Sequence, residues 1–107
     1  MQNKGRNKDE EVIIRVRTPK GNETIGCVLA MLGGGRLQVK CEDGFTRICR
    51  IPGKIKKRVW IRPGYLILLK PWDIQKEERG DVILSYSKAQ VAWLKSRGFI
   101  KNIASCL

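Results

Sequence analysis

Histidine is absent from this chain of 107 residues, and the motifs that usually mark catalysis are missing. Histidine is the commonest general acid-base group near neutral pH and a common metal ligand, so its absence removes most catalytic arrangements. The chain has no GxSxG or HExxH motif, and its acidic residues form surface-type runs such as Asp9-Glu10-Glu11 and Glu77-Glu78. We therefore expect no enzyme, no catalytic residue and no cofactor.

Cysteine is sparse and lacks the spacing of a metal site. The four cysteines include no CxxC pair, so a zinc ion would need four isolated thiolates, and we expect no metal. Cys27 and Cys41 fall at inward positions of expected strands, where they should pack as small buried hydrophobic residues. Such thiols indicate a reducing compartment, and we expect a cytoplasmic protein.

Long apolar runs are missing as well. No run approaches the roughly twenty residues that cross a membrane, and residues 1–11 lack the apolar core of a signal peptide. The basic residues do not lie on an amphipathic helix, so we expect no membrane partner. With 42% hydrophobic residues, the chain suits one domain and is too short for two. We expect a monomer in solution.

Basic residues dominate what is present. The 22 Lys and Arg against 10 Asp and Glu give a net charge of +12 and a pI near 10.0, which is typical of proteins that bind nucleic acid. Between Asp43 and Asp73 the chain has eight basic residues and no acidic one. The eight are Arg47, Arg50, Lys54, Lys56, Lys57, Arg58, Arg62 and Lys70.

Apolar residues interrupt this basic segment. Ile55, Trp60 and Ile61 should hold the segment against the fold. Cations bind phosphates, while an aromatic ring stacks on an unpaired base, so this combination favours single-stranded or looped RNA over a merely solvated charge run. For Trp60 two interpretations stand, a packed loop tryptophan and a partly exposed stacking platform.

Alternating apolar and polar residues indicate strands at 12–16, 36–41 and 45–51, and runs that are apolar on both faces indicate buried strands at 24–32 and 65–69. A further strand is expected at 81–86, so the sequence predicts a β protein. Turn residues separate strands at 18–21, 33–35 and 42–44. Within 36–41, Leu37, Val39 and Cys41 should point inward, and a slip in alternation between Ile48 and Cys49 suggests a bulge.

The remaining segments complete the expected architecture. Residues 52–64 predict a loop or a single helical turn. Ser87-Lys88-Ala89-Gln90 is a capping box, and the helix that it opens should end near Gly98. We expect an all-β barrel with a helical C-terminus. Its parts are a flexible basic N-terminal arm at 1–11, the barrel at 12–86 and a C-terminal helical segment at 87–107.

Both ends of the chain leave alternatives. Lys4, Arg6 and Lys8 make the arm basic, and it either has no role or reaches toward a polyanion. At the other end four apolar residues would form one stripe if the segment were helical. Such a stripe either folds back on the helix or the barrel, or docks a partner. The four residues are Ile100, Ile103, Ala104 and Leu107.

Four blocks of the sequence carry a resemblance to a known family. One block runs from Met31 to Leu37 (MLGGGRL), and a second is Cys41-Glu42-Asp43-Gly44. A third runs from Arg47 to Ile61 (RICRIPGKIKKRVWI), with Gly53 to Ile61 its most specific part, and residues 81–86 (DVILSY) add a fourth. Together they resemble the translation initiation factor 1A family of archaea and eukaryotes over about Val12 to Gly98, and bacterial initiation factor 1 is more distantly similar through Gly53 to Ile61.

The resemblance implies a fold and a task. The fold is a five-stranded oligonucleotide/oligosaccharide-binding (OB) barrel of the S1 type. Members bind ribosomal RNA in the decoding A site of the small ribosomal subunit, keep elongator tRNA out, and promote initiator Met-tRNA binding and start-codon selection. The residues that this implies as RNA contacts are Arg36, Lys40, Arg47, Arg50, Lys54, Lys56, Lys57, Arg58, Trp60 and Arg62.

The resemblance also implies partners. The arm with Lys4, Arg6 and Lys8 is similar to the family's N-terminal tail, which points toward the initiator tRNA, with mRNA nearby. Other initiation factors are expected, including a factor 5B-like GTPase that the C-terminal stripe would contact. The long acidic tail of eukaryotic members is missing, so the chain resembles the archaeal form. The alternatives are a general single-stranded RNA-binding or RNA-chaperone barrel and a structural ribosomal protein.

Overall fold

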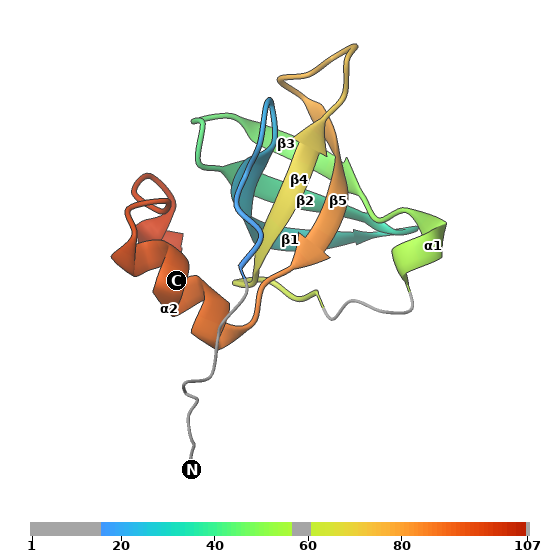
Figure 1. Cartoon of the computed structure of the whole chain (residues 1–107). Coiled ribbons are helices and arrows are strands. Elements are labelled where there is room, and N and C mark those ends of the chain that lie inside the picture. Colours follow the sequence, from blue (N-terminus) through green and yellow to red (C-terminus); the bar gives the residue numbers. More distant parts are fainter. Residues whose placement is uncertain (1–15, 57–60, 107) are drawn as a thin grey trace.

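A closed β-barrel forms the body of the molecule (Figure 1). The computed structural model describes residues 16–56 and 61–106, the side chain of Lys56 excepted. Within these ranges five strands close in the order β1-β2-β3-β5-β4, with β3 and β5 parallel and the other neighbours antiparallel. This is the expected OB-fold. The strands are β1 (Thr24–Gly33), β2 (Arg36–Cys41), β3 (Thr46–Arg50), β4 (Leu66–Pro71) and β5 (Arg79–Ser85).

The inner face of the barrel is filled by alternate residues of the strands. Leu37, Val39 and Cys41 of β2 are fully buried, which confirms their predicted inward orientation. Gly26 of β1 faces Val39, and a Cβ atom at Gly26 would lie 2.3 Å from Val39 Cγ1. Only glycine therefore fits at this point of the β1/β2 pairing.

Two local predictions need correction. The turn expected at 18–21 lies two residues later, because Glu23 N–H donates to the Lys20 carbonyl at 3.0 Å and Gly21 adopts φ +59°. The bulge expected at Ile48 and Cys49 is absent from the β2/β3 ladder, whose register runs without a shift from Arg36↔Arg50 to Lys40↔Thr46. The apparent slip arises because an arginine, Arg47, occupies an inward position.

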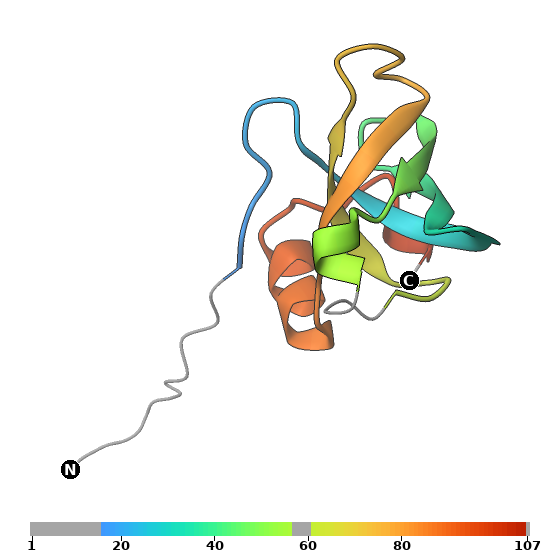
Figure 2. The ribbon, with the colours of Figure 1, turned by 90° about the vertical axis from the view of Figure 1, so that its right-hand side faces the viewer.

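The segment before β4 agrees with its prediction as far as the structure describes it. The single helical turn α1 (Gly53–Lys56) follows β3. Ile51 N–H donates to the Gly35 carbonyl at 2.8 Å and so ties the start of this segment to the β1–β2 turn. Figure 2 shows α1 in front of the barrel when the molecule is viewed from the right-hand side of Figure 1. The strand predicted at 12–16 lies outside the described residues except for Val16.

The helix α2 (Lys88–Ser96) follows the barrel and begins as predicted. Ser87 Oγ accepts from Gln90 N–H at 3.2 Å, and Gln90 Oε1 accepts from Ser87 N–H at 2.8 Å, which completes the capping box. Gly98, at φ +82°, follows the helix in the left-handed conformation. No helix in the described ranges is long and apolar enough to cross a membrane.

The chain after Gly98 folds back onto the barrel and α2. Ile100 and Ile103 are buried beside Leu94 of α2 and Leu68 of β4. The segment ends in a short 3-10 helix, Ala104–Cys106, and is not one continuous α-helix. The apolar stripe therefore packs within the molecule at Ile100 and Ile103, which confirms the first of its two interpretations there; Leu107 lies outside the described residues.

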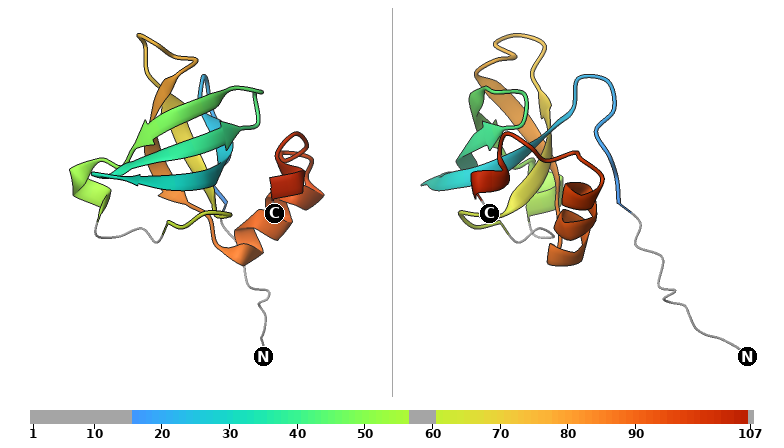
Figure 3. Two further views of the ribbon diagram at one scale, coloured as in Figure 1. Left: turned by 180° about the vertical axis from the view of Figure 1, so that it is seen from behind. Right: turned by 90° about the vertical axis from the view of Figure 1, so that its left-hand side faces the viewer.

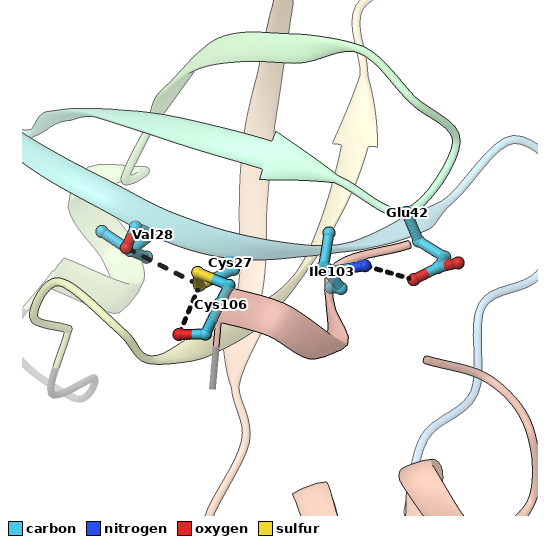
Figure 4. Close-up of a disulfide and its surroundings, with 5 residues drawn as sticks. All are labelled: Cys27, Val28, Glu42, Ile103 and Cys106. Carbon is cyan, nitrogen blue, oxygen red and sulfur yellow. Dashed lines mark hydrogen bonds between the residues drawn. A yellow bond between two sulfur atoms is a disulfide. The ribbon is translucent and has the colours of Figure 1, made fainter. Parts of the chain in front are cut away.

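Glu42, from the β2–β3 turn, holds this C-terminal segment in place. Its carboxylate accepts from the backbone N–H groups of Lys101 at 2.9 Å, Asn102 at 2.8 Å and Ile103 at 3.3 Å. Figure 4 shows the bond from Ile103. The Asn102 side chain donates in return to the Glu42 carbonyl at 2.7 Å. Charge-assisted bonds of this kind are roughly twice as strong as neutral ones, so Glu42 anchors the segment to the barrel.

The cysteines depart from the expectation in one respect. Cys27 of β1 is fully buried as predicted, but its sulfur is bonded to Cys106 in a disulfide (Figure 4). The expectation of a free buried thiol is therefore wrong for Cys27. Cys41 and Cys49 are free and buried, and burial raises the pKa of Cys41 to about 11 and that of Cys49 to about 12. Both stay neutral and unreactive at physiological pH.

Opening the disulfide should destabilise the fold. Its two cysteines are 79 residues apart, and a cross-link over a loop of that length stabilises by about 4 kcal/mol through the unfolded state. We expect dithiothreitol to lower the melting temperature by about 15 °C, as followed by circular dichroism. Cys106→Ser should show the same decrease in melting temperature without reductant, and dithiothreitol should not lower its melting temperature further. An unchanged melting temperature of the native protein in reductant would contradict this.

Candidate nucleic-acid interface

Charged residues form a row across the outer face of four neighbouring strands. In the β-ladders Arg36 of β2 pairs with Arg50 of β3, Arg50 with Asp81 of β5, and Asp81 with Lys70 of β4. Directly paired residues in a sheet have Cβ atoms about 5 Å apart. Arg36, Arg50 and Lys70 are exposed. The register therefore gathers three cations, with one carboxylate between two of them.

Three further predicted contacts are exposed. Lys54 lies on α1, four residues after Arg50, and Lys40 lies at the opposite end of β2 from Arg36, away from the row. Arg62, in the turn before β4, is also exposed. Seen from behind, β2 and β3 lie in front, with α1 on one side of the barrel and α2 with the C-terminal segment on the other (Figure 3, left). The start of β2 and the end of β3 lie on the side of α1, away from α2.

Part of the predicted interface lies outside the described residues. This applies to Lys57, Arg58 and Trp60, and to the side chain of Lys56. It also applies to Lys4, Arg6 and Lys8 of the N-terminal arm. Both interpretations of Trp60 therefore stay predictions.

Arg47 does not lie on this surface. Its side chain is only 3% exposed and donates to both carboxylate oxygens of Asp43, at 3.0 and 2.9 Å. Its Nε–H donates to the Lys76 carbonyl, so Arg47 joins the β2–β3 turn to the β4–β5 loop. Burial alone would lower the pKa of Arg47, but hydrogen bonds with Asp43 and Cys41 raise it, and the charge is retained. Its expected direct contact with RNA conflicts with this buried position.

Trp72, at the start of the β4–β5 loop, lies beside this row and contacts two of its residues. Its Nε1–H donates to Asp81 Oδ1 at 2.9 Å, and Arg50 Cζ lies 5.5 Å from the ring centroid. Sequence reasoning missed that Trp72 lies beside Arg50, because the contact depends on the pairing of β3, β5 and β4. Trp93 of α2 is half-buried and stacks on Phe99 at 6.0 Å between ring centroids.

The chemistry available at this face is binding by charge and stacking. Asp81, the carboxylate within the row, is in an ion pair with Arg50. In the described part of the chain, no three His, Cys, Asp or Glu side chains gather as metal ligands would. Exposed guanidinium and ammonium groups on a rigid sheet suit phosphates, and planar groups suit bases.

Comparison with known proteins gives consistent matches. The family model described as Translation initiation factor 1A / IF-1 matches residues 9–105. Translation initiation factor 1A of Pyrococcus abyssi is 46% identical over 100 residues, covering 94% of this chain and 88% of that protein. The Methanopyrus kandleri protein of the same name is 51% identical over 94 residues, covering 88% and 84%. The solution structure of bacterial translation initiation factor 1 from the Wolbachia endosymbiont of Brugia malayi gives a TM-score of 0.48 at 25% identity, covering 69% of this chain and 86% of that one.

Arg47 and Arg50 should respond differently to truncation. Arg47→Ala leaves the Lys76 carbonyl and the Asp43 carboxylate without their donor, so we expect the free energy of unfolding to fall by about 2–3 kcal/mol. Arg50→Ala removes an exposed ion pair and should cost under about 1 kcal/mol. Urea denaturation of both variants measures the difference. Equal losses, or a larger loss for Arg50→Ala, would contradict the structural role of Arg47.

Proposed function

The chain belongs to the translation initiation factor 1A family, and we propose that it binds ribosomal RNA in the decoding A site of the small ribosomal subunit. There it promotes initiator Met-tRNA binding and start-codon selection. The family consists of non-enzymatic RNA-binding factors of translation initiation, and its members associate with the small subunit. The proposal assigns this chain a place on that subunit and a step in initiation.

The observation that carries the proposal is the cationic row on the barrel. Arg36, Arg50 and Lys70 are brought together by strand register, next to the acid-free segment that continues into α1. The sheet fixes the backbone positions of these cations, so binding to phosphates needs to order only their side chains. The proposed RNA contacts are Arg36, Lys40, Arg50, Lys54, Lys56, Lys57, Arg58, Trp60 and Arg62. Arg47 acts indirectly, by fixing the β2–β3 turn.

Partners other than ribosomal RNA follow from the proposed position on the small subunit. The arm with Lys4, Arg6 and Lys8 extends toward the initiator tRNA, with mRNA nearby, and the protein works as a monomer in the cytoplasm. A factor 5B-like GTPase is a partner among the other initiation factors. Of the four residues of the expected stripe, Ile100 and Ile103 are not available for this contact, because both side chains are buried in the fold.

Sedimentation tests whether the protein is a factor. Purified protein mixed with small subunits should sediment with them and exchange rapidly with labelled free protein. A structural ribosomal protein would stay bound through every wash and co-purify with translating ribosomes. A general RNA chaperone would bind large-subunit RNA and unrelated RNA as well as it binds small subunits. Either of these results would contradict the proposal.

The basic segment should set the salt dependence of binding. Replacing Lys54, Lys56, Lys57 and Arg58 by Gln should flatten the slope of log affinity against log salt by roughly 3, at about 0.7 per phosphate contact on single-stranded RNA. A matched control replaces Lys88, Lys95, Arg97 and Lys101, four exposed cations on α2 and in the chain that follows it. The control should keep the slope. If both quadruple variants flatten it equally, binding depends on net charge and not on this segment.

Trp60 should contribute a stacking contact. If it is an exposed platform, Trp60→Ala weakens binding to small subunits by about 1–3 kcal/mol, the size of one base–aromatic contact, and changes the melting temperature little. Filter binding and circular dichroism on the same preparation give both quantities. A large fall in melting temperature with binding intact would show that Trp60 is a packed residue.

A further inference from the structure

A hollow of about 450 Å³ opens on the outer face of the barrel, where β3, β5 and the end of β4 meet. It is lined by Arg50, Lys70, Pro71, Trp72, Asp73 and Asp81. These residues come from three strands and from the start of the β4–β5 loop. The hollow includes Arg50 and Lys70 of the cationic row, but it also contains two carboxylates and an indole ring. This mixture differs from a simple phosphate-binding surface.

The Arg50 guanidinium is held in a fixed position at the edge of the hollow. It lies over the Trp72 ring, with Cζ 5.5 Å from the centroid, and donates to Asp81 Oδ2 at 3.2 Å. Asp81 also accepts from Trp72 Nε1–H through its other oxygen, at 2.9 Å. One carboxylate thus orients both the ring and the guanidinium. The Arg50 side chain is nevertheless 59% exposed, which leaves its planar group accessible beyond the ring.

A hydrogen-bond donor, Lys70, and an acceptor, Asp73, lie at the rim of the hollow. Among the described residues, no hydrogen bond or ion pair engages the Lys70 ammonium or the Asp73 carboxylate. Both side chains are exposed. A phosphate would be attracted by Lys70 and repelled by Asp73. A nucleotide satisfies both, because it carries an anionic phosphate and, on adenine, guanine or cytosine, an exocyclic amino group that donates hydrogen bonds.

We propose that this hollow binds one unstacked nucleotide of an RNA strand. The base stacks on the exposed face of the Arg50 guanidinium, which is backed by Trp72, since arginine planes serve as stacking platforms for unpaired bases. Asp73 accepts from an amino group of the base, and Lys70 contacts the adjacent phosphate. Trp72 and Asp81 act as positioning residues, because they hold Arg50. The inference rests on the proposed RNA-binding function and adds a base-binding site to it.

The test separates stacking from charge. Arg50→Lys keeps the positive charge and loses the planar group, so it should weaken stacking and leave phosphate attraction intact. Arg97→Lys is the matched control, because Arg97 also lies over a tryptophan, 5.2 Å from the Trp93 centroid, but at the C-cap of α2 and outside the hollow. The probe is a single-stranded RNA of about ten nucleotides with 2-aminopurine at alternating positions. Stacking quenches the fluorescence of 2-aminopurine.

The wild-type protein should bind the probe with quenching. Arg50→Lys should lose affinity by about tenfold, the size of one stacked base, with reduced quenching and an unchanged salt slope. Arg97→Lys should behave as wild type. If Arg50→Lys keeps full affinity and quenching while the Lys54, Lys56, Lys57 and Arg58 replacement still flattens the salt slope, the base site is wrong and RNA binding stands. If the wild-type protein binds neither the probe nor small subunits, both proposals fall.

Discussion

The pairing register of the closed barrel is the constraint from which the surface chemistry follows. A slip of one residue would move every inner side chain of a strand to the outside, so the buried Leu37, Val39 and Cys41 hold β2 in one register. The same pairing sets Arg36, Arg50, Asp81 and Lys70 side by side on the outer face. The packing of the core therefore determines where the cations lie. It brings charged residues from strands that are far apart in the sequence onto one surface.

Arg47, in contrast, is a buried cation with a structural role. Its side chain points inward from β3, where Asp43 balances its charge and its Nε–H donates to the Lys76 carbonyl. A buried arginine without such partners would be strongly destabilising. With them it links the β2–β3 turn to the β4–β5 loop. The same turn supplies Glu42, which anchors the C-terminal segment. The β2–β3 turn thus contacts both the β4–β5 loop and the C-terminal segment.

Local patterns in the sequence predicted much of this structure. Alternation and short apolar runs located the strands, and the capping box at Ser87 located α2, because these signals depend on neighbouring residues. The features that these patterns did not predict depend on contacts between residues distant in the sequence. Arg47 looked like its exposed neighbours, since an inward arginine is recognisable only once Asp43 and Lys76 surround it. The Cys27–Cys106 disulfide and the Arg50–Trp72 contact likewise join segments that only the folded chain brings together.

We propose that one face of the barrel binds small-subunit RNA at the decoding A site. Chemical footprinting of small-subunit RNA, with and without the purified protein, is the sharpest test of this proposal. Protections should be confined to the nucleotides that form the A site, and they should weaken when Arg36 and Arg50 are replaced together. Protections spread over the subunit, or centred on another site, would contradict binding at the A site.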